Sequence, residues 1–157
     1  MTQAGSTPSG ETRQRPIVPY LRLDGNPRPH LVGSRCTACG QAYVGLRRNC
    51  ARCAAIDQME EIRLSDHGEV YVWTIVHQSA PGIPVPYVAA IVDLPEGVSI
   101  RANLEGVEPD PTKLKFGMPV EMYTEPAMNL LPDGSLTPRI DREGNTIIAY
   151  KFRPMAE

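Results

Sequence analysis

The sequence has few aromatic residues and no long apolar run. Phe, Trp and Tyr together make up 6% of the 157 residues, with one Trp and two Phe among them. No stretch of about 18 apolar residues occurs, so the sequence does not predict a helix that spans a membrane. Residues 1–16, MTQAGSTPSGETRQRP, contain no apolar segment of the kind found in secretory signal peptides. From these absences we expect a cytoplasmic protein without membrane association.

Neither sign of charge is in large excess. Sixteen Lys and Arg residues stand against eighteen Asp and Glu residues, which gives a net charge of −2. A general nucleic-acid binder usually has a basic balance or patch, and single-strand binders also stack bases on aromatic rings. The composition therefore argues against nucleic acid as a partner. A single-stranded nucleic-acid-binding OB protein is the alternative from a different functional class.

Long helices are not expected either, because 16 Pro and 13 Gly residues interrupt the chain. Short apolar runs between turn residues predict five strands, at residues 70–76, 87–94, 98–104, 119–124 and 146–152. The first strand carries apolar side chains on both faces, which is typical of a strand buried on both sides. The residues predicted to form the core are Val70, Val72, Val76, Ile91 and Val120. The protein is therefore predicted to be mainly β, as a small barrel or sandwich.

The composition divides the chain into four parts. Residues 1–16 are rich in Ser, Thr, Gly, Gln and Pro and are predicted to be disordered. Residues 17–35 hold apolar side chains between three prolines and two glycines, and we interpret them as a docking segment. All the cysteines fall in residues 36–60. The predicted barrel takes up residues 61–157, with an inserted hairpin at about 130–145 between two turn signals.

The four cysteines form two CxxC pairs that are ten residues apart, in CTACGQAYVGLRRNCARC. A CxxC turn directs two sulfurs at one metal ion, and a second such turn completes a tetrahedron. Gly40 follows the first pair, where a glycine permits a left-handed backbone conformation. The spacing predicts a zinc ribbon whose ligands are Cys36, Cys39, Cys50 and Cys53.

Four thiols at this spacing have three other possible uses. A redox CxxC normally lies in a βαβ pattern, which the sequence does not show. Two disulfides would suit a secreted chain. Iron fits the same four-sulfur cage and is the closest rival to zinc. Because four protein ligands leave no open position for a substrate, the metal is predicted to be structural.

Catalytic residues are not predicted for this chain. Thiolytic cleavage of a C–C bond needs a cysteine nucleophile, and all four cysteines are assigned to the metal. The three histidines, His30, His67 and His77, do not stand near a serine nucleophile motif. We therefore expect no turnover by the isolated chain.

Several stretches of the sequence together resemble the zinc-ribbon/OB-fold acyl-CoA-associated protein family. In chain order they are CTACG (36–40), GEVYVWTIVHQ (68–78), PYVAAIVDLPEG (86–97), GMPVEMYTE (117–125) and YKFRP (150–154). The resemblance covers about residues 35–154. It implies an N-terminal zinc ribbon followed by a five-stranded OB-fold barrel.

The resemblance also implies a non-catalytic accessory subunit. Such a subunit would bind a thiolase-like catalytic partner and help to form or stabilise its acyl-CoA site, for thiolytic C–C cleavage or condensation. A symmetric partner dimer would give a heterotetramer with two copies of each chain. CoA or acyl-CoA would be a ligand shared with the partner, and an aromatic acyl-CoA of a degradation pathway is one substrate that fits. An accessory subunit of an acyl-CoA aldolase or hydratase is the alternative within the family.

Basic residues could hold the phosphates of CoA. The candidates are Arg47, Arg48, Lys151 and Arg153, although each is also explained as ordinary surface charge. Two loops are expected to dock on a partner. The proline-rich residues 79–86 carry Ile83 and Val85 on a stiff backbone, which loses little entropy on binding. The inserted piece at 130–145 adds its own apolar residues, Leu130, Leu131 and Leu136.

Overall fold

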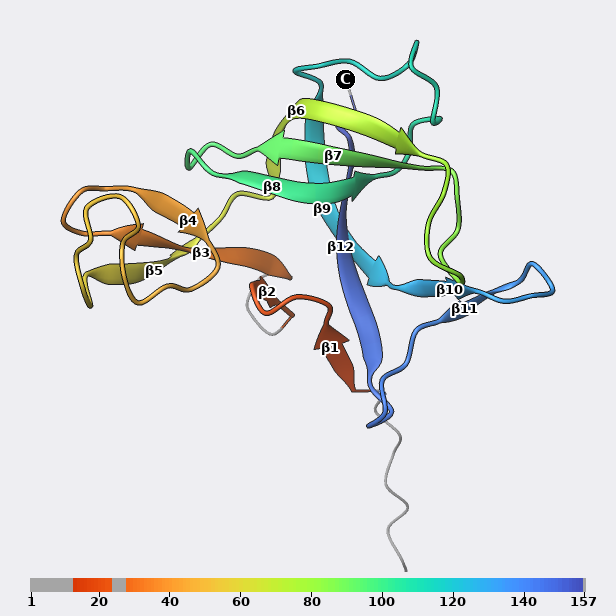
Figure 1. Cartoon of the computed structure of the whole chain (residues 1–157), viewed down its shortest axis with the longest axis horizontal. Coiled ribbons are helices and arrows are strands. Elements are labelled where there is room, and N and C mark those ends of the chain that lie inside the picture. The colour runs from red at the N-terminus through yellow and green to blue at the C-terminus, as the bar shows by residue number, and fades with distance from the viewer. Residues whose placement is uncertain (1–12, 24–27, 157) are drawn as a thin grey trace, which may run out of the picture.

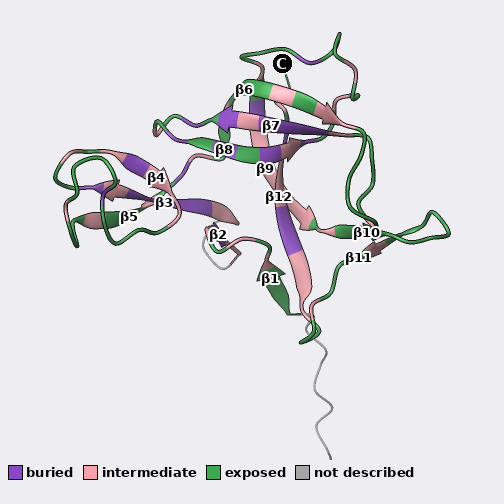
Figure 2. Cartoon of the chain, in the orientation of Figure 1, coloured by how far each residue is buried: buried purple, intermediate pink, exposed green. Residues whose placement is uncertain are grey.

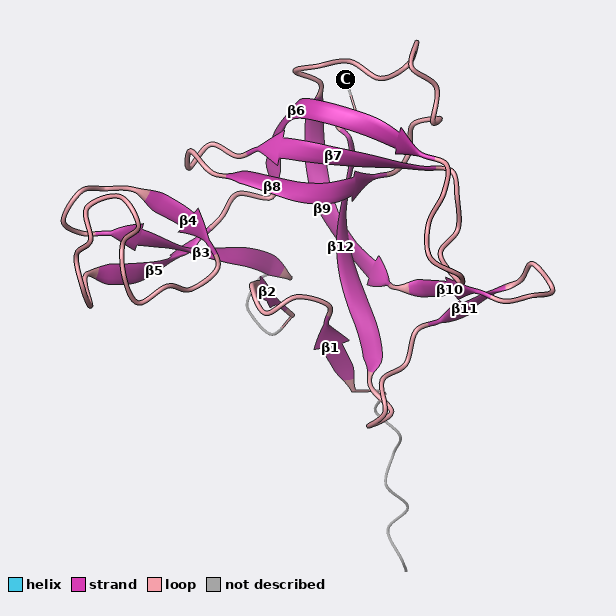
Figure 3. Ribbon diagram, viewed as in Figure 1, coloured by secondary structure: helices cyan, strands magenta, loops and turns pink. Residues whose placement is uncertain are grey.

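The computed structural model describes residues 13–23 and 28–156. The described residues form β-strands and no helix (Figure 3). They therefore contain no helix that is long and apolar enough to cross a membrane. The strands make a six-stranded, a four-stranded and a two-stranded sheet. Residues 1–12 of the segment predicted to be disordered lie outside the described part of the chain.

The six-stranded sheet closes on itself as a barrel (Figure 1). Its five main strands are β6 (His67–Val76), β7 (Tyr87–Asp93), β8 (Ser99–Leu104), β9 (Pro119–Pro126) and β12 (Thr146–Pro154). β6, β7 and β8 pair in antiparallel order, and β8 pairs parallel with β12. β12 then pairs with β9, and β9 pairs with β6, which completes the circle. This closed five-stranded barrel is an OB-fold, so the predicted fold class is confirmed.

A sixth strand, β1 (Gln14–Pro16), pairs parallel with the start of β12. Two further backbone hydrogen bonds extend this pairing: Ile17 N donates to Ile148 O, and Thr146 N donates to Arg13 O, at 2.8 and 2.9 Å. The last residues of the segment predicted to be disordered are therefore built into the barrel sheet.

The four-stranded sheet belongs to the cysteine region. It consists of β2 (Leu21–Arg22), β3 (His30–Cys36), β4 (Ala42–Val44) and β5 (Met59–Arg63), and β3 pairs with each of the other three. Leu21, Leu31 and Val32 in this sheet are at most 1% exposed. Residues 17–23 and 28–35 are thus part of the fold rather than a free segment, and these three side chains are not available to a partner.

One apolar cluster runs through both sheets. The ribbon contributes Leu21, Leu31 and Ala42, and the barrel contributes residues such as Val92 and Phe152. The purple segments in Figure 2 mark the buried residues along the strands of both sheets. Because the cluster is continuous, the ribbon and the barrel are held as one unit.

The prediction that β6 is buried on both faces is wrong. Val70 and Val120 are confirmed in the core at 1% and 0% exposure, but Val72 is 40% exposed. Val76 and Ile91, also predicted to be core residues, are half-buried. The outer face of this strand is therefore apolar and accessible to solvent.

A β-bulge in β6 causes this difference. Val70 pairs with Val92 and Val72 pairs with Ile91, so Tyr71 is an extra residue without a partner on β7. An extra residue reverses the in–out alternation beyond it. Hence Trp73 and Ile75 pack against the core, while Val72 and Thr74 point outward.

The connection between β9 and β12 forms the two-stranded sheet, a hairpin of β10 (Met128–Leu130) and β11 (Leu136–Pro138). It overlaps the predicted inserted hairpin at about 130–145, but begins at Met128 and ends at Pro138. Leu130 N donates a hydrogen bond of 2.8 Å to Gly82 O in the β6–β7 loop. Figure 1 shows this loop reaching from the barrel to β10. Two predicted docking loops, far apart in sequence, are therefore in contact.

The corrected strand faces can be tested with two isoleucines on neighbouring strands. Ile100 on β8 is 3% exposed and lies in the core, whereas Ile91 on β7 is on the outer face. Ile100→Ala should lower the free energy of unfolding by about 2–5 kcal/mol, because it leaves a cavity. Ile91→Ala should lower it by about 1 kcal/mol or less. Denaturant unfolding of both variants measures this difference, and equal losses would contradict the assignment of faces.

Candidate functional site

The four cysteines predicted to bind a metal come together at the end of the ribbon. Their sulfur atoms all lie within 4.8 Å of one another. Cys36 Sγ lies 3.6 Å from Cys53 Sγ, and Cys39 Sγ lies 3.6 Å from Cys50 Sγ. A metal ion about 2.3 Å from each of four sulfurs would separate the sulfurs by roughly 3.8 Å. The cluster therefore has the size of a tetrahedral four-sulfur site that could hold a metal ion.

The two CxxC turns have the same backbone hydrogen bonds. Gly40 N donates to Cys36 O at 2.8 Å, and Ala54 N donates to Cys50 O at 3.0 Å. Each turn needs a left-handed residue at this position, with φ of 79° at Gly40 and 61° at Ala54. Ala54 therefore takes a conformation that is costly for a residue with a Cβ atom.

The chemistry of the thiols fits a cation at their centre. A hydrogen bond with the Tyr43 hydroxyl is the main reason why the pKa of Cys50 falls to about 6. The Ala55 amide lowers the pKa of Cys53, but burial and hydrogen bonds with the other three sulfurs outweigh it and raise that pKa to about 12. Four thiols this close resist ionising together unless a positive ion compensates them.

Tyr43 is a part of the site that the spacing of the cysteines does not reveal. Its hydroxyl oxygen lies 3.4 Å from Cys50 Sγ and accepts a hydrogen bond of 3.1 Å from the Arg52 backbone amide. The Arg47 guanidinium lies 4.3 Å from the centre of the Tyr43 ring. Such outer contacts orient a metal ligand. The signal in the sequence was a tyrosine on the strand that leads to the second CxxC pair.

The four basic residues proposed from the sequence to contact CoA are not gathered in one place. Arg47 and Arg48 lie on the ribbon, and Lys151 and Arg153 lie on β12 of the barrel (Figure 1). Each has a partner within the chain. Arg48 pairs with Asp57 at 2.8 Å, and Arg153 pairs with Glu121 at 3.0 Å.

Lys151 has the strongest pairing of the four. Its ammonium lies 2.6 Å from a Glu105 oxygen and 2.5 Å from a Glu125 oxygen. Partial burial lowers the pKa of Lys151, but the hydrogen bonds to the two carboxylates outweigh this effect and raise it. The charge of Lys151 is thus already compensated by two acids.

Exposed apolar side chains gather where the β6–β7 loop meets the β10–β11 hairpin. They are 36–53% exposed and consist of Ile83, Val85, Leu130, Leu131 and Leu136. We call this group the two-loop tip. The hydrogen bond between Leu130 and Gly82 joins its two halves. In OB-folds the corresponding pair of loops commonly borders the ligand-binding face.

Comparison with known proteins relates the chain to one family. Residues 61–125 match a family model described as ChsH2, C-terminal OB-fold domain. A DUF35 domain-containing scaffold protein of Methanocaldococcus jannaschii is 33% identical over 127 residues, which cover 80% of this chain and 82% of that protein. The benzoylsuccinyl-CoA thiolase subunit BbsA of Thauera aromatica is 31% identical over 152 residues, or 93% of this chain and 95% of the subunit.

A solved structure, the Ltp2-ChsH2(DUF35) aldolase, has a similar fold. The TM-score is 0.57 at 28% sequence identity, and the match covers 80% of this chain and 84% of that chain. The relatives are thus scaffold proteins and subunits of multi-subunit enzymes.

The two left-handed positions of the CxxC turns give a paired test of the site. Gly40→Ala adds a Cβ atom that meets no atom within 4 Å, so its effect comes from the backbone conformation alone. It should destabilise the turn by about 1 kcal/mol, and Ala54→Gly should have the opposite effect. With a chelator in excess, metal should therefore leave the Gly40→Ala protein roughly fivefold faster than the wild type. Faster release from the Ala54→Gly protein would contradict this account.

Proposed function

The chain belongs to the DUF35 family of OB-fold proteins, and on that premise we propose that it is a non-catalytic accessory subunit of a thiolase-like enzyme that acts on acyl-CoA thioesters. Family membership follows from relatives such as the M. jannaschii protein, which is 33% identical and 82% covered. The similarity to the BbsA subunit over nearly its whole length supports the thiolase assignment. An aromatic acyl-CoA, such as the benzoylsuccinyl-CoA in the name of that relative, is the proposed substrate class of the complex.

The observation that carries the proposal is the two-loop tip. Five aliphatic side chains are held on joined loops, and in this chain alone they remain more than a third exposed. Contiguous exposed apolar groups of this kind mark interaction sites. A catalytic subunit that covers the tip would remove this apolar surface from water. Because thiolase-like subunits are commonly symmetric dimers, the proposed complex has two copies of each chain.

In this proposal the metal is zinc and its role is structural. The four cysteine sulfurs fill the coordination sphere, so no position is open for a substrate. Between β4 and β5, Cys50 is the one side chain that is buried. The metal would therefore replace a hydrophobic core at this end of the ribbon.

Contact with CoA is also part of the proposal. Arg47 lies over the Tyr43 ring, whereas Arg48, Lys151 and Arg153 each pair with a carboxylate. Arg47, which has no ion pair among the described residues, is thus the best placed of the four to donate hydrogen bonds to a CoA phosphate at the interface with the catalytic subunit. Arg48, Lys151 and Arg153 would take part only after exchanging their acidic partners.

An accessory role for an aldolase is the second candidate, and the similarity to the Ltp2-ChsH2(DUF35) aldolase favours it. The two candidates differ in the reaction of the partner rather than in the role of this chain. Assay of the purified complex separates them, because a thiolase consumes free CoA in the cleavage direction and an aldolase does not.

The identity of the metal can be measured directly. Protein produced with both zinc and iron supplied should contain about one equivalent of zinc and little iron, by elemental mass spectrometry. Cys50→Ser should lose the metal and unfold the ribbon, since zinc in such sites contributes on the order of 10 kcal/mol. A folded protein with four free thiols and no bound metal would contradict the prediction.

The docking role of the tip can be tested with charge substitutions. Ile83→Asp with Val85→Asp should weaken binding to the co-produced thiolase-like subunit at least about tenfold, because two carboxylates would have to be desolvated. Met155→Asp, just after β12 at a residue that is 44% exposed, is the matched control and should bind normally. Size-exclusion chromatography with light scattering reports both. Equal binding by all variants would show that the tip is not the interface.

A further inference from the structure

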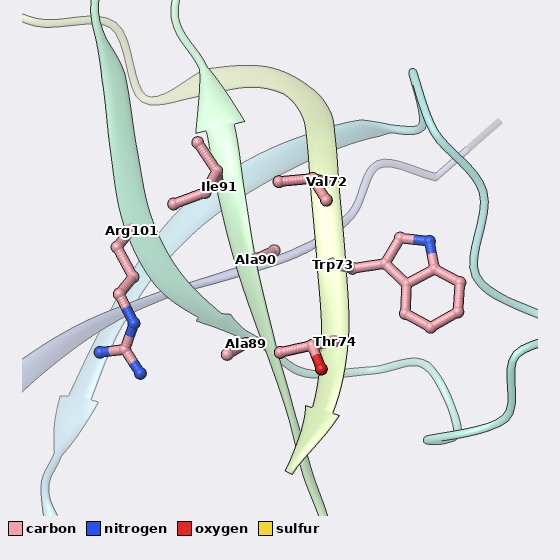
Figure 4. A pocket seen from close by; sticks show the side chains of 7 residues that line it. All are labelled: Val72, Trp73, Thr74, Ala89, Ala90, Ile91 and Arg101. Carbon is pink, nitrogen blue, oxygen red and sulfur yellow. The ribbon is translucent and has the colours of Figure 1, made fainter.

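The bulge in β6 gives the barrel a second apolar surface, on the outside of β6, β7 and β8. Two rows of paired residues point outward there. One row is Val72, Ile91 and Arg101, and the next is Thr74, Ala89 and Asn103. Figure 4 shows the side chains of Val72, Thr74, Ile91 and Arg101 around a shared hollow, with the Trp73 ring directed away from them.

The hollow has the volume of one side chain. It measures about 150 Å³, and Ala89 contributes to its lining while being 7% exposed. A cavity of about this volume holds a benzene molecule. Sites for cofactors and drug-sized ligands are larger, from about 300 to 1,000 Å³. The size therefore favours a single aromatic or branched aliphatic side chain over a free CoA ester.

The charge of Arg101 at the rim of the hollow indicates which residue type lies next to the inserted side chain. Arg101 has no carboxylate within ion-pair distance among the described residues. It stands directly beside Ile91 in the pairing register, on an otherwise apolar row. An aspartate or glutamate close to the inserted side chain would pair with this guanidinium.

The outer face also leads into the two-loop tip. Beyond Thr74 and Ala89 on the same strands, Val76 pairs with Tyr87, and both are half-buried. Residues 77–86 follow directly and carry Ile83 and Val85 of the tip. A single partner could therefore cover the tip and the outer face together.

We propose that the hollow formed by Val72, Thr74, Ala89, Ile91 and Arg101 is a second docking site, which receives one aromatic or branched aliphatic side chain of the catalytic subunit with an acidic residue next to it. This inference rests on the proposed function. It assigns a partner to the outer apolar face of β6, which the sequence predicts to be buried.

Two substitutions address the hollow and its charge separately. Thr74→Trp fills the hollow from an exposed position, and Arg101→Gln removes the charge. Each should raise the dissociation constant for the co-produced catalytic subunit at least tenfold, while Arg101→Lys should raise it less than threefold. Arg101→Gln should also make binding less sensitive to salt.

The matched control for charge is Lys115→Gln. Lys115 is exposed on the β8–β9 connector and has no ion pair among the described residues, so its loss should leave binding unchanged. Thermal unfolding of each variant shows whether the barrel is intact. If the Thr74→Trp protein is unfolded, the dissociation constant of the Arg101→Gln protein tests the proposal. Wild-type binding by Arg101→Gln would overturn the proposal.

A photo-crosslinking residue in place of Thr74, within the assembled complex, identifies the occupant. A cross-link to a catalytic-subunit peptide with an apolar residue beside an Asp or Glu supports the proposal. A cross-link to a second copy of this chain, or none while the complex forms, overturns it and leaves the proposed function standing. Failure of the wild-type chains to associate contradicts both.

Discussion

The ribbon is fixed on the barrel by a shared apolar cluster. The leucines that join the barrel residues in this cluster are Leu21, Leu31 and Leu64. Each of the three is at most 2% exposed. β3 completes the connection, because its first half pairs with β2 and its last residue is Cys36 of the cysteine cluster. Buried leucines therefore set the position of the cysteine cluster relative to the barrel. A rigid link of this kind suits a subunit that has to present several surfaces at fixed positions.

Much of this architecture could be predicted from short-range patterns. The CxxC spacing predicts the cluster of Cys36, Cys39, Cys50 and Cys53, because two tight turns can place four sulfurs without help from distant parts of the chain. The five barrel strands follow from apolar runs between turn residues. Features that depend on pairing between strands could not be predicted. The bulge at Tyr71 depends on how β6 pairs with β7, which the sequence of β6 alone does not reveal. Because of the bulge, Val72 points outward and not into the core as predicted.

Long-range contacts explain the other differences. The apolar residues of 17–35 suggested a docking segment, but Leu21 and Leu31 pair across β2 and β3 and enter the core. Conversely, Lys151 resembled a free cation in the sequence, and two glutamates from β9 and the end of β8 neutralise it. The contact of Tyr43 with Cys50 is also invisible in the spacing. In each case the deciding neighbour lies on another strand.

The proposed function depends on two apolar surfaces that remain exposed in this chain. The two-loop tip and the outer face of β6–β8 are both apolar and lie on adjoining parts of the barrel. The opposite faces of the same strands form the core. Native mass spectrometry of this chain produced together with the proposed thiolase-like subunit tests the central claim most directly. The account predicts a mass that corresponds to two copies of each chain, with one metal ion per copy of this chain. Separate masses for the two proteins at micromolar concentration, with this chain folded and metal-loaded, would contradict it.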